Sequence, residues 1–367
     1  MGLKVVDQYD RTRAYPARPA KGPSNVSVGE DARPLQTLVW YPAMQSADKP
    51  MTVGDYVKLA DAELDFNAPD EKGNKWRSRL LASSDIPLWA VRGAKAAEGR
   101  YPVLIYAPSD SSISWENADL CEYLASNGYV VLASPSMGTS TRDMTDDLEG
   151  IDSQARDVSL LITYAGTLPN VDLSKVGVVS WSWGGISSLF AAARDTRIDA
   201  LAEMDGSMRY YPGLVQKAGD VHPEQMKIPL LFFTQGDASL EGLAKDDAPV
   251  ADRTGPNVLN AWKDGDFIQV RMLGMSHPEF SSMVQRRKTA QSFADDEVAD
   301  YGRDDTNTSY VWVALYTLNF LNAYLKHDGS AKTFLERSPA DNGVPKHFMG
   351  VMSRPAQKAG AKSVAVP

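Results

Sequence analysis

Residues 175–194 read KVGVVSWSWGGISSLFAAAR and form the strongest local pattern of the chain. Lys175–Trp181 is rich in valine and tryptophan, which is typical of a buried strand. Gly184–Arg194 is mostly apolar and long enough to predict a helix. Ser182 lies between them. We therefore expect a strand that turns directly into a helix, with Ser182 at the corner.

Small residues flank Ser182 with the spacing of a nucleophile elbow, which is usually written G-x-S-x-G. Ser180 and Gly184 occupy the two small positions, and Ser180 departs from the usual glycine. Such a turn lifts the serine hydroxyl above the sheet edge. It also aims the next backbone N–H, that of Trp183, at a developing oxyanion. The pattern favours Ser182 as a nucleophile over an inert serine in a strand-to-helix turn.

Strands and helices alternate along the rest of the chain, which predicts an α/β fold with a mostly parallel central sheet and helices on both faces. The other expected strands are Leu3–Tyr9, Leu35–Tyr41, Tyr101–Tyr106, Tyr129–Ala133, Ile198–Met204, Ile228–Thr234 and Phe267–Leu273. The other expected helices are Glu116–Ser126, Asp152–Leu168 and a late helix with Ala314, Leu318, Leu321 and Leu325 on its buried side.

Two long segments, residues 44–100 and 236–266, interrupt this alternation, with one expected helix near Asp55–Leu64 in the first. Insertions of this kind form either lids and substrate walls or plain surface. The length of 367 residues is compatible with one large domain or two small ones. We expect a single domain over residues 1–354 that carries both insertions, followed by a flexible tail at residues 355–367.

The composition narrows the classes of function. A formal net charge of -9 disfavours nucleic-acid binding, because an acidic surface repels phosphate backbones. The single cysteine, Cys121, rules out an intrachain disulfide and is expected to pack on a helix rather than react. The sequence contains no metal-site or dinucleotide motif, so we expect neither a metal nor an organic cofactor.

The sequence does not fix the compartment or the oligomeric state. Its longest apolar run, Val311–Leu325, is too short to span a bilayer and is interrupted by polar residues. The chain as given shows no secretory signal, which leaves a cytoplasmic protein or a periplasmic or secreted one with its signal removed.

A catalytic serine needs a base, and the chain has 4 histidines. His277 follows the expected strand Phe267–Leu273 late in the chain, as the elbow order of serine, acid and histidine requires. His222 precedes a strand, His327 ends the late helix and His347 lies near the C-terminus. His277 is therefore the expected base. For the acid, Asp205 and Asp237 each follow an expected core strand, and either could instead be a turn residue.

Several of these segments together resemble the platelet-activating-factor acetylhydrolase-like branch of the α/β-hydrolases, near the dienelactone hydrolases. The resemblance covers about Leu35 to Leu325 and is carried by Leu38–Pro42, Tyr101–Ile105, Leu124–Val131, the Ser182 turn, Met204–Gly206 and His277–Phe280. In this branch the acid follows the strand just after the elbow helix, which implies Asp205. Dienelactone hydrolases place it one strand later, which implies Asp237. The Asp-Gly context favours Asp205.

The resemblance also implies a loop that donates the second oxyanion N–H, after the strand Tyr101–Tyr106. The family has a His-Gly pair there, whereas this chain has Ala107-Pro108-Ser109-Asp110. We assign the second donor to the backbone of Asp110, beside that of Trp183.

Apolar and aromatic residues follow the same strand ends and predict a substrate pocket at one edge of the sheet, although core packing is the more usual role of such residues. They are Trp181, Met208, Tyr210, Tyr211 and Phe280.

The sequence thus predicts a serine-dependent carboxylic-ester hydrolase that forms an acyl-enzyme with a small or apolar ester, such as a short-acyl or phospholipid-like one. Hydrolysis of lactones, peptides or carbon–carbon bonds by the same triad is the nearest alternative. A binding protein on a hydrolase scaffold is the alternative of another class, and the altered loop at Ala107-Pro108 is the feature in its favour.

Overall fold

A mixed sheet of ten strands runs through the part of the chain that the computed structural model describes, which comprises residues 1–15, 32–63, 83–236, 257–286, 301–345 and 347–357. The strand order is β10-β9-β8-β7-β6-β4-β5-β2-β1-β3. The strands are β1 (Gly2–Ala14), β2 (Ala32–Tyr41), β3 (Val91–Arg92), β4 (Tyr101–Ala107), β5 (Val130–Ala133), β6 (Val171–Trp181), β7 (Ala200–Met204), β8 (Leu230–Gln235), β9 (Phe267–Met272) and β10 (Met349–Arg354).

The central strands β5, β4, β6, β7, β8 and β9 are parallel, whereas β2 and β10 pair antiparallel with the outer two of them. Parallel neighbours need crossover connections, and here most of these contain helices. The carboxyl ends of the central strands consequently meet at one edge of the sheet, where ligands bind in folds of this kind.

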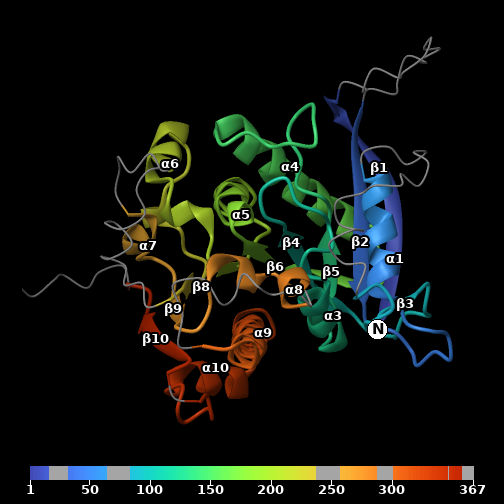
Figure 1. Ribbon diagram of the computed structural model, residues 1–367. Helices are drawn as coiled ribbons and strands as arrows, with labels where there is room; N and C mark the ends of the chain where they lie inside the picture. The colour runs from blue at the N-terminus through green and yellow to red at the C-terminus, as the bar shows by residue number, and fades with distance from the viewer. Residues whose placement is uncertain (16–31, 64–82, 237–256, 287–300, 346, 358–367) are drawn as a thin grey trace, which may run out of the picture.

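Helices cover both faces, as Figure 1 shows for α5 and α9 on opposite sides of the strands. One apolar cluster joins the sheet to α1, α3, α9 and α10, and a second joins it to α4, α5, α6 and α7. The predicted α/β fold class is confirmed. The helices are α1 (Val53–Leu59), α3 (Ala118–Ser126), α4 (Leu148–Ala165), α5 (Trp183–Arg194), α6 (Pro212–Ala218), α7 (Val258–Ala261), α8 (Ser282–Gln285), α9 (Arg303–Leu325) and α10 (Gly329–Glu336), with short 3₁₀ turns η1 (Ala60–Ala62), η3 (Ser207–Arg209), η4 (Pro223–Gln225) and η6 (His277–Phe280).

The element ends differ from the sequence prediction where a side chain caps a helix. Helix α4 begins at Leu148 rather than Asp152, because the Asp147 side chain accepts a hydrogen bond from the Gly150 N–H at 3.1 Å. Helix α1 begins at Val53, after a capping box between Thr52 and Asp55. Local pattern identified these helices, and capping moved their first residues.

Some of the predicted insertions and the tail lie outside the described residues, namely 64–82, 237–256 and 358–367, and so does Asp237. The first insertion contributes α1 and the short edge strand β3, which pairs with β1. At the start of the predicted tail, the Ala356 N–H donates to Asp266 at 2.9 Å and the Gln357 N–H donates to the Lys263 carbonyl at 2.8 Å.

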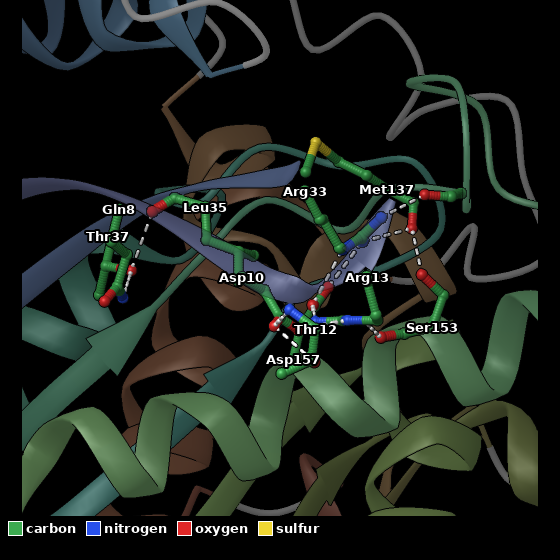
Figure 2. Close-up of polar contacts among 11 residues, drawn as sticks. Gln8, Asp10, Thr12, Arg13, Arg33, Leu35, Thr37, Met137, Ser153 and Asp157 are labelled. Carbon is green, nitrogen blue, oxygen red and sulfur yellow. Dashed lines mark hydrogen bonds and ion pairs between the residues drawn. The ribbon is translucent and has the colours of Figure 1, made fainter. Parts of the chain in front are cut away.

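A buried ion-pair network ties the β1–β2 ribbon to α4, as Figure 2 shows. Arg33 donates to both carboxylate oxygens of Asp157, at 3.0 and 2.7 Å, and to the Met137 carbonyl at 2.9 Å. Arg13 also pairs with Asp157. Bidentate pairs of this kind are directional, so the network fixes the loop after β5 relative to the ribbon.

None of the described helices is long and apolar enough to cross a membrane.

Candidate active site

Ser182 forms the corner between β6 and α5. Its backbone has φ 55 and ψ -122, a conformation that residues other than glycine rarely adopt and that costs about 1–3 kcal/mol. Hydrogen bonds hold it there: the Ser182 N–H donates to the Met204 carbonyl at 3.1 Å, and the Ser182 carbonyl accepts from the Gly185 N–H at 2.9 Å and the Ser207 N–H at 2.7 Å. The strained corner is therefore fixed by β7 and by the first turn of α5.

The small residues of the elbow are required by close neighbours. A Cβ atom on Gly184 would lie 2.2 Å from the Ala107 carbonyl oxygen. A Cβ atom on Gly185 would lie 2.6 Å from Gly206 Cα. The elbow thus packs directly against the ends of β4 and β7. At the preceding small position, Ser180 is fully buried.

Three predicted residues form a continuous chain of hydrogen bonds at this corner. His277 Nε2 lies 2.9 Å from Ser182 Oγ, and His277 Nδ1 lies 2.5 Å from Asp205 Oδ2. A carboxylate can only accept, so Nδ1 carries the ring proton and Nε2 accepts the Ser182 hydroxyl. The His277 side chain is 33% exposed and Asp205 is fully buried, while Ser182 is partly exposed. This arrangement leaves the hydroxyl and the base accessible to a ligand.

Asp205 is held as a carboxylate. Burial raises the pKa of Asp205, but the Arg209 guanidinium, the bond from His277 and the Gln235 N–H lower it more, so that it lies below its usual value. Arg209 Nη2 lies 3.4 Å from Asp205 Oδ1, the oxygen that His277 does not use. The acid can therefore stabilise a positive charge that develops on His277.

Gln235 is a residue of the site that the sequence did not indicate. Its backbone N–H donates to Asp205 at 3.3 Å, and its side-chain oxygen accepts the His277 backbone N–H at 2.8 Å. Its amide nitrogen donates to the Tyr210 hydroxyl at 3.4 Å. The available signal was its position at the end of β8. This strand lies between β7, which precedes Asp205, and β9, which precedes His277. Gln235 fixes the acid and the base segments relative to each other.

Of the two predicted oxyanion donors, one belongs to the elbow and the other to the loop that packs against it. Trp183 is the first residue of α5, where backbone N–H groups have no acceptor within the helix. Asp110 lies in the loop after β4, which packs on Gly184. Burial raises the pKa of the Asp110 side chain, and the Ser111 hydroxyl donates to it at 3.0 Å. That side chain is thus engaged within its own loop.

The five predicted pocket residues separate into two groups. The Trp181 ring lies 5.5 Å from the His277 ring, the Tyr210 hydroxyl contacts the Gln235 side chain, and the Tyr211 ring lies 5.3 Å from the Trp183 ring. Met208 and Phe280 are fully buried in the two apolar clusters. The structure therefore brings Trp181, Tyr210 and Tyr211 to the site and places Met208 and Phe280 in the core. A cavity of about 620 Å³ beside Arg13 and Arg33 contains none of these residues in its lining.

A further carboxyl group, that of Glu203, lies beneath the elbow. Glu203 is fully buried next to Ser180 in the sheet register, and neither of its carboxyl oxygens has a hydrogen-bond partner among the described residues. Burial raises the pKa of Glu203 well above its usual value, which favours the neutral acid in the folded protein.

We expect Glu203→Gln to stabilise the protein increasingly as the pH rises. The unfolded wild type loses this proton near its ordinary pKa of 4.5, whereas the folded form keeps it to a higher pH. The free energy of unfolding of the wild type therefore falls by about 1.4 kcal/mol per pH unit between those two pKa values. Glutamine does not titrate, so the variant does not show this fall. Thermal unfolding at about pH 5 and about pH 8 measures the difference, with the exposed Glu224→Gln as control. A gain in Tm that does not depend on pH would contradict it.

Comparison with known proteins gives a likeness at the level of the fold. No protein-family model and no curated protein matches the chain. Among solved structures, a ferulic acid esterase from Streptomyces cinnamoneus aligns with 89% of this chain and 90% of its own, at a TM-score of 0.61 and 18% sequence identity. The two proteins share a mostly parallel sheet with helices around it, and at this identity the likeness concerns the fold.

Proposed function

We propose that this chain is a serine-dependent carboxylic-ester hydrolase. The observation that carries the proposal is the chain of contacts from Asp205 Oδ2 through His277 to Ser182 Oγ, at 2.5 and 2.9 Å, on a strained strand-to-helix corner. Strain of this kind persists where surrounding contacts maintain it, and it is concentrated at functional sites. An inert serine would need neither the corner nor a histidine oriented by a buried carboxylate.

The reaction follows from this geometry. Ser182 Oγ attacks the ester carbonyl while His277 Nε2 accepts its proton, and Asp205 stabilises the imidazolium. The N–H groups of Trp183 and Asp110 stabilise the oxyanion of the tetrahedral intermediate. His277 then protonates the leaving alcohol, and an acyl-enzyme remains. Water attacks the acyl group with His277 again as the base, which releases the acid and restores Ser182.

The substrate proposed is a small or apolar ester, bound beside Trp181, Tyr210 and Tyr211. A solved structure with the same fold is called a ferulic acid esterase, so an aromatic acyl group belongs among the candidates. The narrower affiliation with the platelet-activating-factor acetylhydrolase-like branch rests on the acid that follows β7. We also propose that residues 1–354 act as one catalytic domain, since β10 at residues 349–354 belongs to the same sheet as the elbow.

A substrate panel tests the function. We expect turnover of p-nitrophenyl acetate, butyrate or octanoate or of methyl ferulate, together with covalent labelling of Ser182 by a fluorophosphonate. A lactone and an anilide in the same panel distinguish an esterase from the alternative uses of the triad. Absence of both turnover and labelling would refute the proposal, and labelling at another serine would refute the assignment of Ser182.

Replacing the acid tests its role separately. Asp205→Asn should reduce kcat by about 10³- to 10⁴-fold, because an amide that donates to the ring favours the wrong tautomer of His277. Asp237→Asn, at the other predicted acid, should remain near the wild-type rate. Steady-state kinetics of both variants decide the question. A large loss at Asp237 with a normal rate at Asp205 would favour the dienelactone-hydrolase arrangement.

A further inference from the structure

We propose that Glu116 is a positioning residue, which holds the loop between β4 and α3 in the geometry that stabilises the oxyanion. The inference rests on the proposed function and adds a residue that does not touch the substrate. This loop, residues 108–117, includes Asp110, and it packs against the first turn of α5.

The Glu116 carboxylate accepts hydrogen bonds from the loop and from the strand that precedes it. Glu116 is fully buried. Its Oε1 accepts the Ser109 N–H at 2.6 Å and the Tyr106 hydroxyl at 2.9 Å, and its Oε2 accepts the Ser109 hydroxyl at 2.7 Å. Every one of these partners is a donor, so the carboxylate form fits the loop as built. Ser109 is thereby fixed at both its backbone and its side chain, directly before Asp110.

The opposite side of the loop is fixed as well. The Pro108 carbonyl accepts a hydrogen bond from the Gln154 side chain of α4 at 2.7 Å. A Cβ atom on Gly184 would lie 2.7 Å from that carbonyl oxygen. The loop is thus confined between α4, α5 and Glu116, and a change at Glu116 alters its distance from the elbow.

Glu116 and Asn117 also form hydrogen bonds with the segment that follows His277 and η6. The Glu116 carbonyl accepts from the Ser281 hydroxyl at 3.0 Å and from the Met283 N–H at 3.3 Å. The Asn117 side-chain oxygen accepts the Ser282 N–H at 2.6 Å and the Tyr310 hydroxyl at 2.8 Å. Glu116 and Asn117 together therefore fix the position of the loop 108–117 relative to the segment after η6.

The burial of the Glu116 carboxylate is unfavourable in free energy. Burial raises the pKa of Glu116 to about 7, although its hydrogen bonds oppose that shift. Glutamine has nearly the same shape, but its amide nitrogen in the place of Oε2 must donate to the Ser109 hydroxyl, which reverses that hydrogen bond. The Ser109 N–H and the Tyr106 hydroxyl then donate to a neutral amide oxygen, and such bonds are weaker than bonds to a carboxylate, so the loop is held less tightly.

Helix α3 supplies a matched control in Glu122. Burial likewise raises the pKa of Glu122 to about 7. Its Oε1 accepts the Tyr56 hydroxyl at 2.6 Å and its Oε2 accepts the Trp89 N–H at 2.7 Å. Glu122 thus combines the same burial and the same kinds of donors, but its partners Tyr56 and Trp89 are not among the residues assigned to the site.

The experiment compares Glu116→Gln with Glu122→Gln in the full chain. We expect both to lower Tm, whereas kcat for a p-nitrophenyl ester falls about 10- to 100-fold only in Glu116→Gln, with KM near wild type, because small misplacements of catalytic groups have effects of this size. Inhibition by a phenylboronic acid, whose tetrahedral adduct places an oxygen at the oxyanion position, should weaken by a similar factor. Tyr106→Phe, which removes one donor and keeps the carboxylate, should show a smaller loss of the same kind.

Three outcomes would overturn the inference. Equal kcat in the two glutamine variants would show that Glu116 is merely structural, and a rise in KM at unchanged kcat would place its effect in binding. If Glu116→Gln does not fold, wild-type kcat and boronate affinity in Tyr106→Phe would exclude the role. These results leave the proposed function intact. A wild-type chain without turnover or labelling would remove the proposed function and the inference together.

Discussion

Ser182→Ala should reduce kcat for p-nitrophenyl esters on the order of 10⁶-fold and abolish fluorophosphonate labelling. The variant lacks the atom that bonds to the acyl carbon, and the hydroxyl of Ser182 is the one within 2.9 Å of His277 Nε2. Its fold should survive, because the corner is held by backbone hydrogen bonds to Met204, Gly185 and Ser207 that alanine preserves. Stability should consequently stay near wild type while activity disappears.

The control is Ser174→Ala, an exposed serine near the start of the same strand. It should be labelled and should turn over ester at the wild-type rate. Comparable turnover in Ser182→Ala and Ser174→Ala would exclude Ser182 as the nucleophile. Intact-mass measurement after labelling distinguishes a missing nucleophile from a missing fold.

His277→Ala should lower kcat by a similar factor, because the Ser182 hydroxyl then has no group to accept its proton. The exposed His222, which lies 3.4 Å from Glu224, provides the control, and His222→Ala should remain active. Since the two residues act as a unit, the Ser182→Ala/His277→Ala double variant should be about as slow as either single one. A double variant much slower than both would mean that the two residues act independently.

The proposed nucleophile and base could be located in the sequence because their signals are local. Ser182 lies where a strand-like pattern changes to a helix-like one within two residues, and the order of elements singles out His277. The choice between Asp205 and Asp237 could not be made from residues alone, since each follows a core strand. What bears on it is the contact between His277 Nδ1 and Asp205 Oδ2, which joins residues 72 positions apart and has no local pattern; Asp237 lies outside the described residues.

The supporting residues could not be predicted for a related reason. Gln235 contacts a backbone group 42 positions away along the chain, and the Glu116 carbonyl contacts a hydroxyl 165 positions away. In the sequence Glu116 resembles an ordinary acidic residue near a helix start, where such residues are usually solvated. Burial and long-range contacts decide its role, and neither has a local pattern.

The fold was predictable in its centre and less so at its ends. Buried parallel strands give short apolar runs, whereas β10 is a half-exposed segment, Met349–Arg354, that has no clear alternation. It pairs along its whole length with β9, from Met349 opposite Met272 to Arg354 opposite Phe267. The local sequence pattern does not reveal such a strand, because its pairing with β9 determines its conformation.

The place of β10 in the chain has a consequence for synthesis on the ribosome. It is the last of the ten strands to emerge, and it covers the outer edge of the strand that leads to His277. Until residue 354 has left the exit tunnel, β9 presents unpaired backbone groups, which are templates for aggregation. A nascent chain stalled before this point would carry the serine, the acid and the histidine without a finished sheet edge. Such chains should depend on chaperones more than chains released after β10.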